Sequence, residues 1–179
     1  GYINNIEYSG KDVIVLVVDT GIDWKHKDFC EILDETKSRI LFIWDQTDVR
    51  NTNTPEDRDD YNFSGLDYGV EYTQIEINDE LDGTPTGVVL QTDANGHGTH
   101  VSGSACGNGA NSENANYKYA GIAPEADIVF VKAGASSFST VNLLNALEYA
   151  KGIANSTGKP VVVNMSLGGH GNAHDGTRD

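Results

Sequence analysis

The stretch DVIVLVVDTG, residues 12–21, decides the fold. Six of its first seven residues are Val, Ile or Leu, with no polar residue interrupting them. A continuous apolar run of this length predicts a strand that is buried on both faces, as in a parallel sheet. Asp19, Thr20 and Gly21 then predict a turn that ends the strand. An aspartate directly after a buried strand is costly unless a partner uses its charge.

The rest of the chain alternates between similar apolar runs and helical patterns. Further strands are predicted at residues 40–44, 127–132 and 161–165. A helix of small residues is predicted from Val101 to Cys106 or slightly beyond. A second helix is predicted over 141–154, where apolar residues recur at helical spacing after a cap at Ser139 or Thr140. Strands that alternate with helices predict an α/β fold, a parallel sheet flanked by helices with right-handed crossovers.

The region from residue 45 to about 90 breaks this pattern and is strongly acidic. Residues 45–82 hold twelve Asp or Glu and only two Arg, so they supply −10 of the formal net charge of −15. We interpret the region as an inserted, solvated surface segment with a short hairpin around 70–77. Carboxylates also bind hard cations, so a structural calcium ion is an open alternative, although no spaced D-x-D-x-D-G pattern occurs.

Composition disfavours several other classes of protein. A chain this acidic would repel nucleic acid, because phosphates are neutralised by clustered Lys and Arg. No apolar run approaches the roughly 18 residues that a membrane span needs. We therefore expect neither nucleic acid nor a membrane among the partners. Cys30 and Cys106 are too few for a disulfide framework and lack metal-site spacing, so both are predicted to be small buried side chains.

Asp19 by itself leaves more than one function open. An Asp-Thr-Gly triplet after a strand is common turn chemistry, and aspartic proteases also use it. Their mechanism needs two carboxylic acids that share one proton. This chain contains one such triplet, inside an α/β pattern, so an aspartic protease is disfavoured.

A second segment, NGHGTHVSG at residues 95–103, contains two histidines. His97 lies between two glycines at the predicted helix start, which leaves its ring approachable. His100 follows three residues later, and this spacing can hold zinc. The glutamate of an H-E-x-x-H motif is absent, so we do not expect a zinc site.

A third segment, NMSLGG at residues 164–169, carries a predicted strand into glycine-rich backbone. Such a strand end can offer N–H and C=O groups to an extended ligand. By itself the segment is a strand end, and its role stays open on these residues alone.

These three segments, together with YAGIAP at 119–124, resemble the subtilisin-like serine proteases over Lys11 to Gly169. The resemblance implies that His97 is the base that activates a serine hydroxyl and that Asp19 orients its ring. It also implies that Ser166 and Gly168 pair with substrate backbone and that Leu167 walls a side-chain pocket. Residues 136–138 would form the opposite strand of the cleft, and His100 would point into the helix packing.

The family's nucleophile lies in a Gly-Thr-Ser motif, and this chain contains no such motif. We interpret residues 1–179 as the N-terminal part of a subtilisin-like catalytic domain, incomplete at its C-terminal side and inactive by itself. The serine is then expected in a C-terminal remainder. A catalytically inactive peptide-binding module, a pseudoprotease, is the alternative that stays open. The resemblance further implies peptide or protein substrates, no required cofactor, and a secreted or cell-envelope location.

Overall fold

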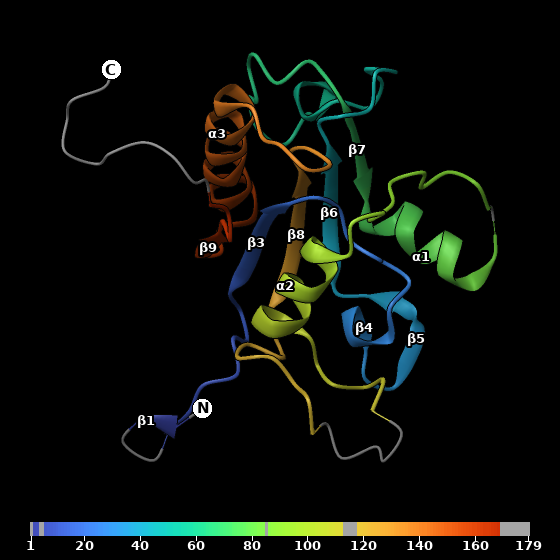
Figure 1. Ribbon diagram of the computed structural model, residues 1–179, viewed down its shortest axis with the longest axis vertical. Coiled ribbons are helices and arrows are strands. Elements are labelled where there is room, and N and C mark those ends of the chain that lie inside the picture. The colour runs from blue at the N-terminus through green and yellow to red at the C-terminus, as the bar shows by residue number, and fades with distance from the viewer. Residues whose placement is uncertain (1, 4–5, 85, 113–117, 169–179) are drawn as a thin grey trace.

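The computed structural model describes residues 2–3, 6–84, 86–112 and 118–168, and Figure 1 shows its elements around a central sheet. Five strands of this sheet lie in the order β7-β6-β8-β3-β9. Their bounds are Ile14–Asp19 for β3, Ile40–Asp45 for β6, Val70–Thr73 for β7, Asp127–Lys132 for β8 and Val161–Asn164 for β9. The four strands predicted from apolar runs are therefore confirmed, with bounds that differ by at most two residues.

The α/β fold is confirmed, and the predicted parallel sheet carries in addition one antiparallel edge strand, β7. β3 pairs in parallel with β8 and β9, and β6 pairs in parallel with β8. β7 pairs antiparallel with β6, so that Phe42 lies opposite Thr73. No α-helix lies between β6 and β7, so the chain can return along β6 in the opposite direction.

Within the described part of the chain, three α-helices accompany the sheet: α1 Gln74–Asp82, α2 His97–Cys106 and α3 Thr140–Thr157. α3 confirms the second predicted helix, and the Ser139 hydroxyl caps it by accepting a hydrogen bond of 3.2 Å from the Val141 amide. α2 confirms the first predicted helix but begins four residues earlier, at His97. Gly96 precedes it with φ 82°, a left-handed conformation that glycine adopts without strain.

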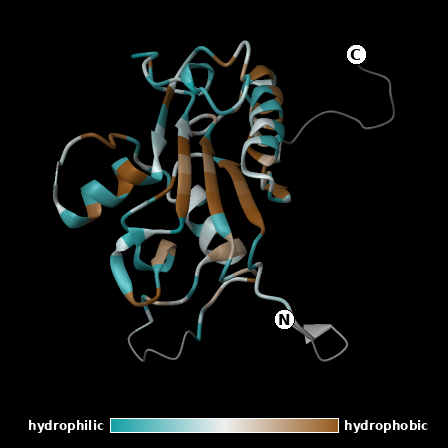
Figure 2. Cartoon of the chain, turned by 180° about the vertical axis from the view of Figure 1, so that it is seen from behind, coloured by the Kyte–Doolittle hydropathy of each residue, from teal (hydrophilic) through white to brown (hydrophobic). Residues whose placement is uncertain are grey.

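Both faces of the sheet are covered, which explains the unbroken apolar runs. Val15 and Val17 of β3 pack in a core with residues of α1 and α2. Leu16 and Val18 point the other way, into a core with α3. Because alternate residues of a strand face opposite sides, a strand between two helical layers must be apolar throughout. Figure 2 shows these central strands as the most hydrophobic part of the chain.

Residues 70–77 do not form the predicted hairpin. They run from β7 into α1, and a capping box makes the transition: the Glu76 carboxylate accepts from the Thr73 amide at 2.8 Å, and the Thr73 hydroxyl accepts from the Glu76 amide at 3.4 Å. Ile77 and Leu81, four residues apart, then pack against the core. These reciprocal bonds satisfy amides at the helix start and favour a helix over a turn.

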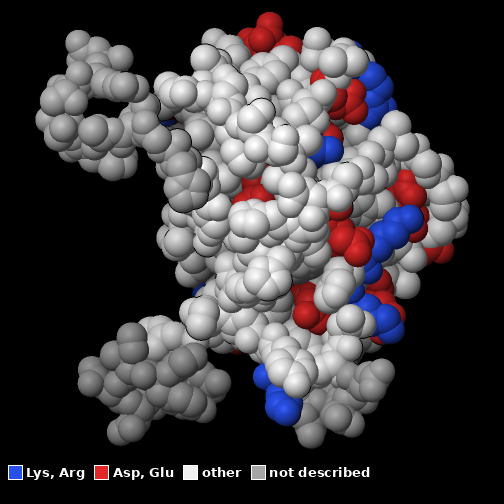
Figure 3. Space-filling view, in the orientation of Figure 1, with Lys and Arg blue, Asp and Glu red and all other residues white. Residues whose placement is uncertain are grey.

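The acidic stretch is solvated only in part. Phe63 and Leu66 are 2% exposed and belong to the core beneath α3. Glu71 of β7 is 3% exposed, accepts from Arg58 at 3.1 Å, and is also hydrogen-bonded by the Tyr149 hydroxyl of α3. Many other carboxylates of the molecule lie on the surface, where Figure 3 shows Lys and Arg interspersed among them. The stretch therefore contributes to the core as well as to the surface charge.

The remaining elements are short: strand pairs β1 Tyr2–Ile3 with β2 Ile6–Glu7 and β4 Cys30–Glu31 with β5 Asp34–Ser38, and the 3-10 helices η1 Lys27–Phe29 and η2 Pro55–Asp57. Cys30 and Cys106 are free and buried, as predicted. Burial raises the pKa of the Cys106 thiol to about 11. Within the described ranges, no helix is both long and apolar enough to cross a membrane.

Candidate active site

The structure brings Asp19 and His97 together. Asp19 is the last residue of β3 and is 0% exposed, whereas His97 is the first residue of α2 and its side chain is 48% exposed. The Asp19 Oδ1 atom lies 2.8 Å from the His97 Nδ1 atom. The Thr20 amide donates to the same oxygen at 2.7 Å. A buried carboxylate is thus paired with a half-exposed imidazole at the carboxyl end of a central strand, where α/β proteins place their sites.

The close approach of α2 to β3 depends on Gly98. A Cβ atom at Gly98 would lie 2.1 Å from the Gly21 carbonyl oxygen and 3.1 Å from the Asp19 Cβ atom. Both distances are shorter than ordinary van der Waals contact. Only a residue without a side chain lets the helix start at this position, so the glycine after His97 sets the distance to Asp19.

This geometry leaves one ring nitrogen available for chemistry. Nδ1 faces a carboxylate, which favours the tautomer with the proton on Nδ1. Nε2 then carries a lone pair, and no described residue forms a hydrogen bond with it. An exposed imidazole lone pair can accept a proton from an approaching hydroxyl, and a buried carboxylate behind the ring stabilises the imidazolium that results.

Asp93 is a site residue that the sequence patterns do not single out. It lies in the loop before α2, and its carboxylate contacts the start of α2 and the Thr20 hydroxyl after β3. The one local signal is an Asp-x-x-Gly turn that ends at Gly96, where the helix begins. The contact with Thr20 joins residues 73 apart in the sequence, which no local pattern reveals.

Ser166, Leu167 and Gly168 lie at the same edge of the sheet as the Asp19–His97 pair. They follow β9, which pairs in parallel with β3 so that Asn164 lies opposite Val17. Ser166 and Gly168 are exposed and Leu167 is half-buried. The Ser166 hydroxyl donates to the Asn164 side chain at 2.8 Å. Their proposed role in substrate binding stays a prediction.

His100 does not point into the helix packing, contrary to expectation. α2 packs through Gly98, Ser102 and Cys106, which are buried and recur every four residues. At about 100° per residue, His100 lies roughly 200° around the helix from Gly98 and is exposed. It lines a cavity of about 410 Å³ with Ser166 and residues of α2.

The opposite cleft strand predicted at 136–138 is a loop in the structure. A Cβ atom at Gly134 would lie 2.1 Å from the Ser137 carbonyl oxygen, so the chain folds back on itself after β8. Phe138 packs partly against the core beneath α3. The Asn95 side chain donates to the Ala135 carbonyl at 3.3 Å, which places this loop beside the loop before His97.

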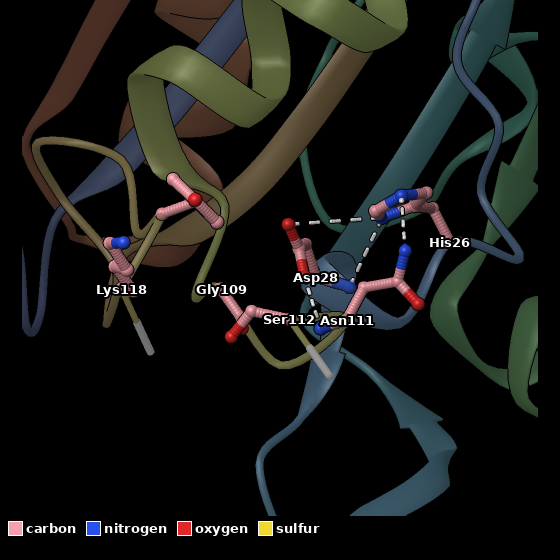
Figure 4. A pocket seen from close by; sticks show the side chains of 7 residues that line it. His26, Asp28, Gly109, Asn111, Ser112 and Lys118 are labelled. Carbon is pink, nitrogen blue, oxygen red and sulfur yellow. Dashed lines mark hydrogen bonds and ion pairs between the residues drawn. The ribbon is translucent and has the colours of Figure 1, made fainter. Parts of the chain in front are cut away.

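A separate cavity of about 510 Å³ lies between η1 and the loop after α2 (Figure 4). Its polar groups are bonded to one another: the Asp28 carboxylate accepts from the Asn111 amide at 2.7 Å, and the Asn111 side chain lies 3.4 Å from the His26 ring. These contacts hold the loop after α2 against η1. None of the predicted catalytic or substrate-binding residues lines this cavity.

Calcium in the acidic stretch also stays a prediction. A cavity of about 310 Å³ there is lined by three carboxylates, those of Asp57, Glu71 and Glu76. Each of them already accepts hydrogen bonds from protein donors. Across the described residues, no group of three or more His, Cys, Asp or Glu is placed to hold a metal ion.

Comparison with known proteins gives one consistent result. Residues 10–178 match the subtilase family of peptidases. The PII-type proteinase of Lactococcus lactis subsp. cremoris is 29% identical over 170 residues, which cover 92% of this chain and 8% of the relative. The C5a peptidase of Streptococcus pyogenes is 26% identical over 169 residues, or 89% of this chain and 12% of that protein. The chain thus spans a small part of these relatives' length.

Solved structures agree with this fold. The CspB protease of Clostridium perfringens superposes with a TM-score of 0.73 and 29% identity, covering 98% of this chain and 32% of that one. Sphericase superposes with a TM-score of 0.57 and 24% identity, covering 95% of this chain and 42% of the other, and supports the fold alone.

Proposed function

Because the chain belongs to the subtilase family, we propose that it supplies the Asp and His of a serine endopeptidase triad. The observation that carries the proposal is the 2.8 Å contact between the buried Asp19 carboxylate and the half-exposed His97 ring. In this mechanism the His97 Nε2 atom takes the proton of a serine hydroxyl as its oxygen attacks the peptide carbonyl. The imidazolium then returns that proton to the leaving amine, and Asp19 stabilises the charged ring.

The nucleophilic serine is proposed to come from a C-terminal remainder beyond Asp179. The support is that no Gly-Thr-Ser motif occurs in residues 1–179. β9 also lies at one edge of the sheet, where Val162 is 57% exposed and can receive further structure. Residues 1–179 alone would then lack peptidase activity. A secreted or cell-envelope location is proposed from the resemblance, and fractionation of the producing cells tests it.

The substrate is proposed to be an extended peptide or protein that pairs with the backbone of Ser166 and Gly168. The exposure of both residues beside the Asp19–His97 pair supports this. Leu167 would contact a side chain of the substrate, which favours apolar or uncharged residues at that position.

The test is hydrolysis of a peptide library by the intact protein and by its His97→Ala variant. Loss of the base should lower turnover roughly 10³-fold or more. His100→Ala is the matched control, because it removes a ring from the exposed side of the same helix. It should keep at least about a tenth of the wild-type turnover.

Three results would count against the proposal. Near-normal hydrolysis by His97→Ala would show that His97 is not the general base. Strict selection of a phosphorylated or metal-chelating residue would contradict the proposal that Leu167 contacts an apolar or uncharged side chain of the substrate. An intact wild-type protein that binds peptides without cleaving them would support the pseudoprotease alternative instead.

A further inference from the structure

We infer that Asp93 is a positioning residue for the Asp19–His97 pair, because its carboxylate fastens the start of α2 to the turn after β3. The inference rests on the proposed function of that pair. Asp93 forms no hydrogen bond with Asp19 or with the His97 ring among the described contacts. It contacts their neighbours in the chain instead: Thr20, which follows Asp19, and Gly96 and Thr99, which lie on either side of His97.

Both oxygens of the Asp93 carboxylate are used. Oδ1 accepts from the Thr20 hydroxyl at 3.0 Å and from the Gly96 amide at 3.0 Å. Oδ2 accepts from the Thr99 amide at 2.9 Å and from the Thr99 hydroxyl at 2.7 Å. One side chain therefore satisfies two of the otherwise unpaired amides at the start of α2 and also reaches the end of β3.

The two threonine hydroxyls extend this contact in both directions. The Thr20 hydroxyl accepts from the Gly98 amide of α2 at 3.2 Å, and the Thr99 hydroxyl accepts from the Asp23 amide after β3 at 2.8 Å. Each hydroxyl has one proton, and each gives it to Asp93. Their lone pairs must then face the amides across the gap, so Asp93 orients both links.

These links join the neighbours of the catalytic partners. Thr20 follows Asp19, and Gly98 follows His97, so the bond between them spans the pair directly. A shift of α2 away from β3 would stretch this bond and the Asp19–His97 contact together. The network thus holds the distance on which the proposed proton transfer depends.

The charge of Asp93 suits this role. Burial raises the pKa of its carboxyl, but hydrogen bonds from the Thr99 hydroxyl and from the Thr99 and Gly96 amides outweigh that effect, so the pKa lies below the usual range. The group is ionised at neutral pH and can accept on both oxygens. A negative charge is also favourable at the N-terminus of a helix.

Asparagine cannot replace the carboxylate in this network. Gly96 donates to one oxygen and Thr99 to the other, and both donors are backbone amides that cannot turn away. Whichever way the side-chain amide of the Asp93→Asn variant is turned, its NH₂ group faces one of them. The substitution keeps the shape of the side chain and breaks at least one link.

The test is Asp93→Asn in the intact protein, with kcat and KM expressed per active site titrated by a fluorophosphonate. We expect kcat per titrated site to fall about 10- to 100-fold, with KM changed less than about threefold. A role in stability alone would lower the number of titrated sites and leave kcat per site unchanged. Asp57→Asn is the matched control, because Asp57 accepts from the Thr54 amide and hydroxyl at 2.7 and 3.0 Å in the acidic stretch.

A second pair of variants keeps the inference testable if Asp93→Asn does not fold. Thr99→Val removes the hydroxyl that links Asp93 to Asp23, and Thr99→Ser keeps it. We expect kcat per titrated site to be at least about fivefold lower for valine than for serine. Values within twofold of wild type for both Asp93→Asn and Thr99→Val would overturn the inference. If His97→Ala were fully active as well, the proposed function itself would fail.

Discussion

At the scale of single residues, Gly98 is the one whose size matters most for the pair. We expect Gly98→Ala to force α2 away from β3, because the new methyl group would meet the Gly21 carbonyl, which is backbone and cannot rotate aside. Such overpacking costs about 1–3 kcal/mol in the free energy of unfolding. A longer Asp19–His97 distance should also lower kcat about 10- to 100-fold. Thermal unfolding and peptide hydrolysis of the intact protein measure the two effects.

Ser104→Ala serves as the control for Gly98→Ala. Ser104 lies on the exposed side of the same helix, and its hydroxyl bonds only the His100 carbonyl one turn earlier. Removing it should change the free energy of unfolding by about 0.5 kcal/mol or less. Wild-type kcat in Gly98→Ala would show that the close approach of the two elements is not needed.

Sequence patterns drew attention to Asp19 and His97, but they did not reveal the role of Asp93 or the orientation of His100. Asp19 and His97 stand out because each lies at the end of a pattern, after an apolar run and between two glycines. Asp93 lies at the end of no such pattern, and its contact with Thr20 forms only when distant parts of the chain fold together. His100 was misplaced because a two-histidine motif does not say which side of a helix faces the sheet.

At the scale of elements, buried strands were easier to predict than the acidic region. β3 and β8 are covered on both sides, so each contains an unbroken apolar run, with charged residues only at the strand ends. α1 has Ile77 and Leu81 as its main core contacts, and its other residues are largely acidic. A helix with so narrow an apolar face leaves a weak periodic signal, and the Thr73–Glu76 capping box was the better indicator.

The acidic region is joined to the rest of the fold by Glu71, which connects β7 to α3 through Tyr149 and to the preceding loop through Arg58. Burial raises the pKa of the Glu71 carboxyl, an effect that the Arg58 charge partly opposes. Glu71→Ala would leave a largely buried guanidinium and a buried hydroxyl without this partner. We expect a loss of about 3 kcal/mol or more in the free energy of unfolding of the intact protein.

Glu148→Ala is the comparison for Glu71→Ala. Glu148 pairs with Lys151 on α3 at 2.7 Å, and both side chains are more than half exposed. Removing an exposed pair should change stability by well under about 1 kcal/mol. Equal effects of the two substitutions in chemical denaturation would show that the buried network does not hold the acidic region to the core.

At the scale of the whole molecule, the proposed active site is formed by two stretches of chain. Asp19 and His97 are fixed by contacts within residues 1–179, whereas the serine is proposed to lie beyond them. The edge strand β9 and the exposed Ser166–Gly168 segment lie beside the pair, where a further segment could complete the sheet and the cleft. Activity then belongs to the intact protein.

The most direct measurement is fluorophosphonate labelling of the intact protein, followed by digestion and mass spectrometry of the labelled peptide. The probe reacts with an activated serine, so we expect one labelled serine beyond residue 179 and loss of labelling in His97→Ala. A label on any serine within residues 1–179, or labelling that persists without His97, would contradict this expectation.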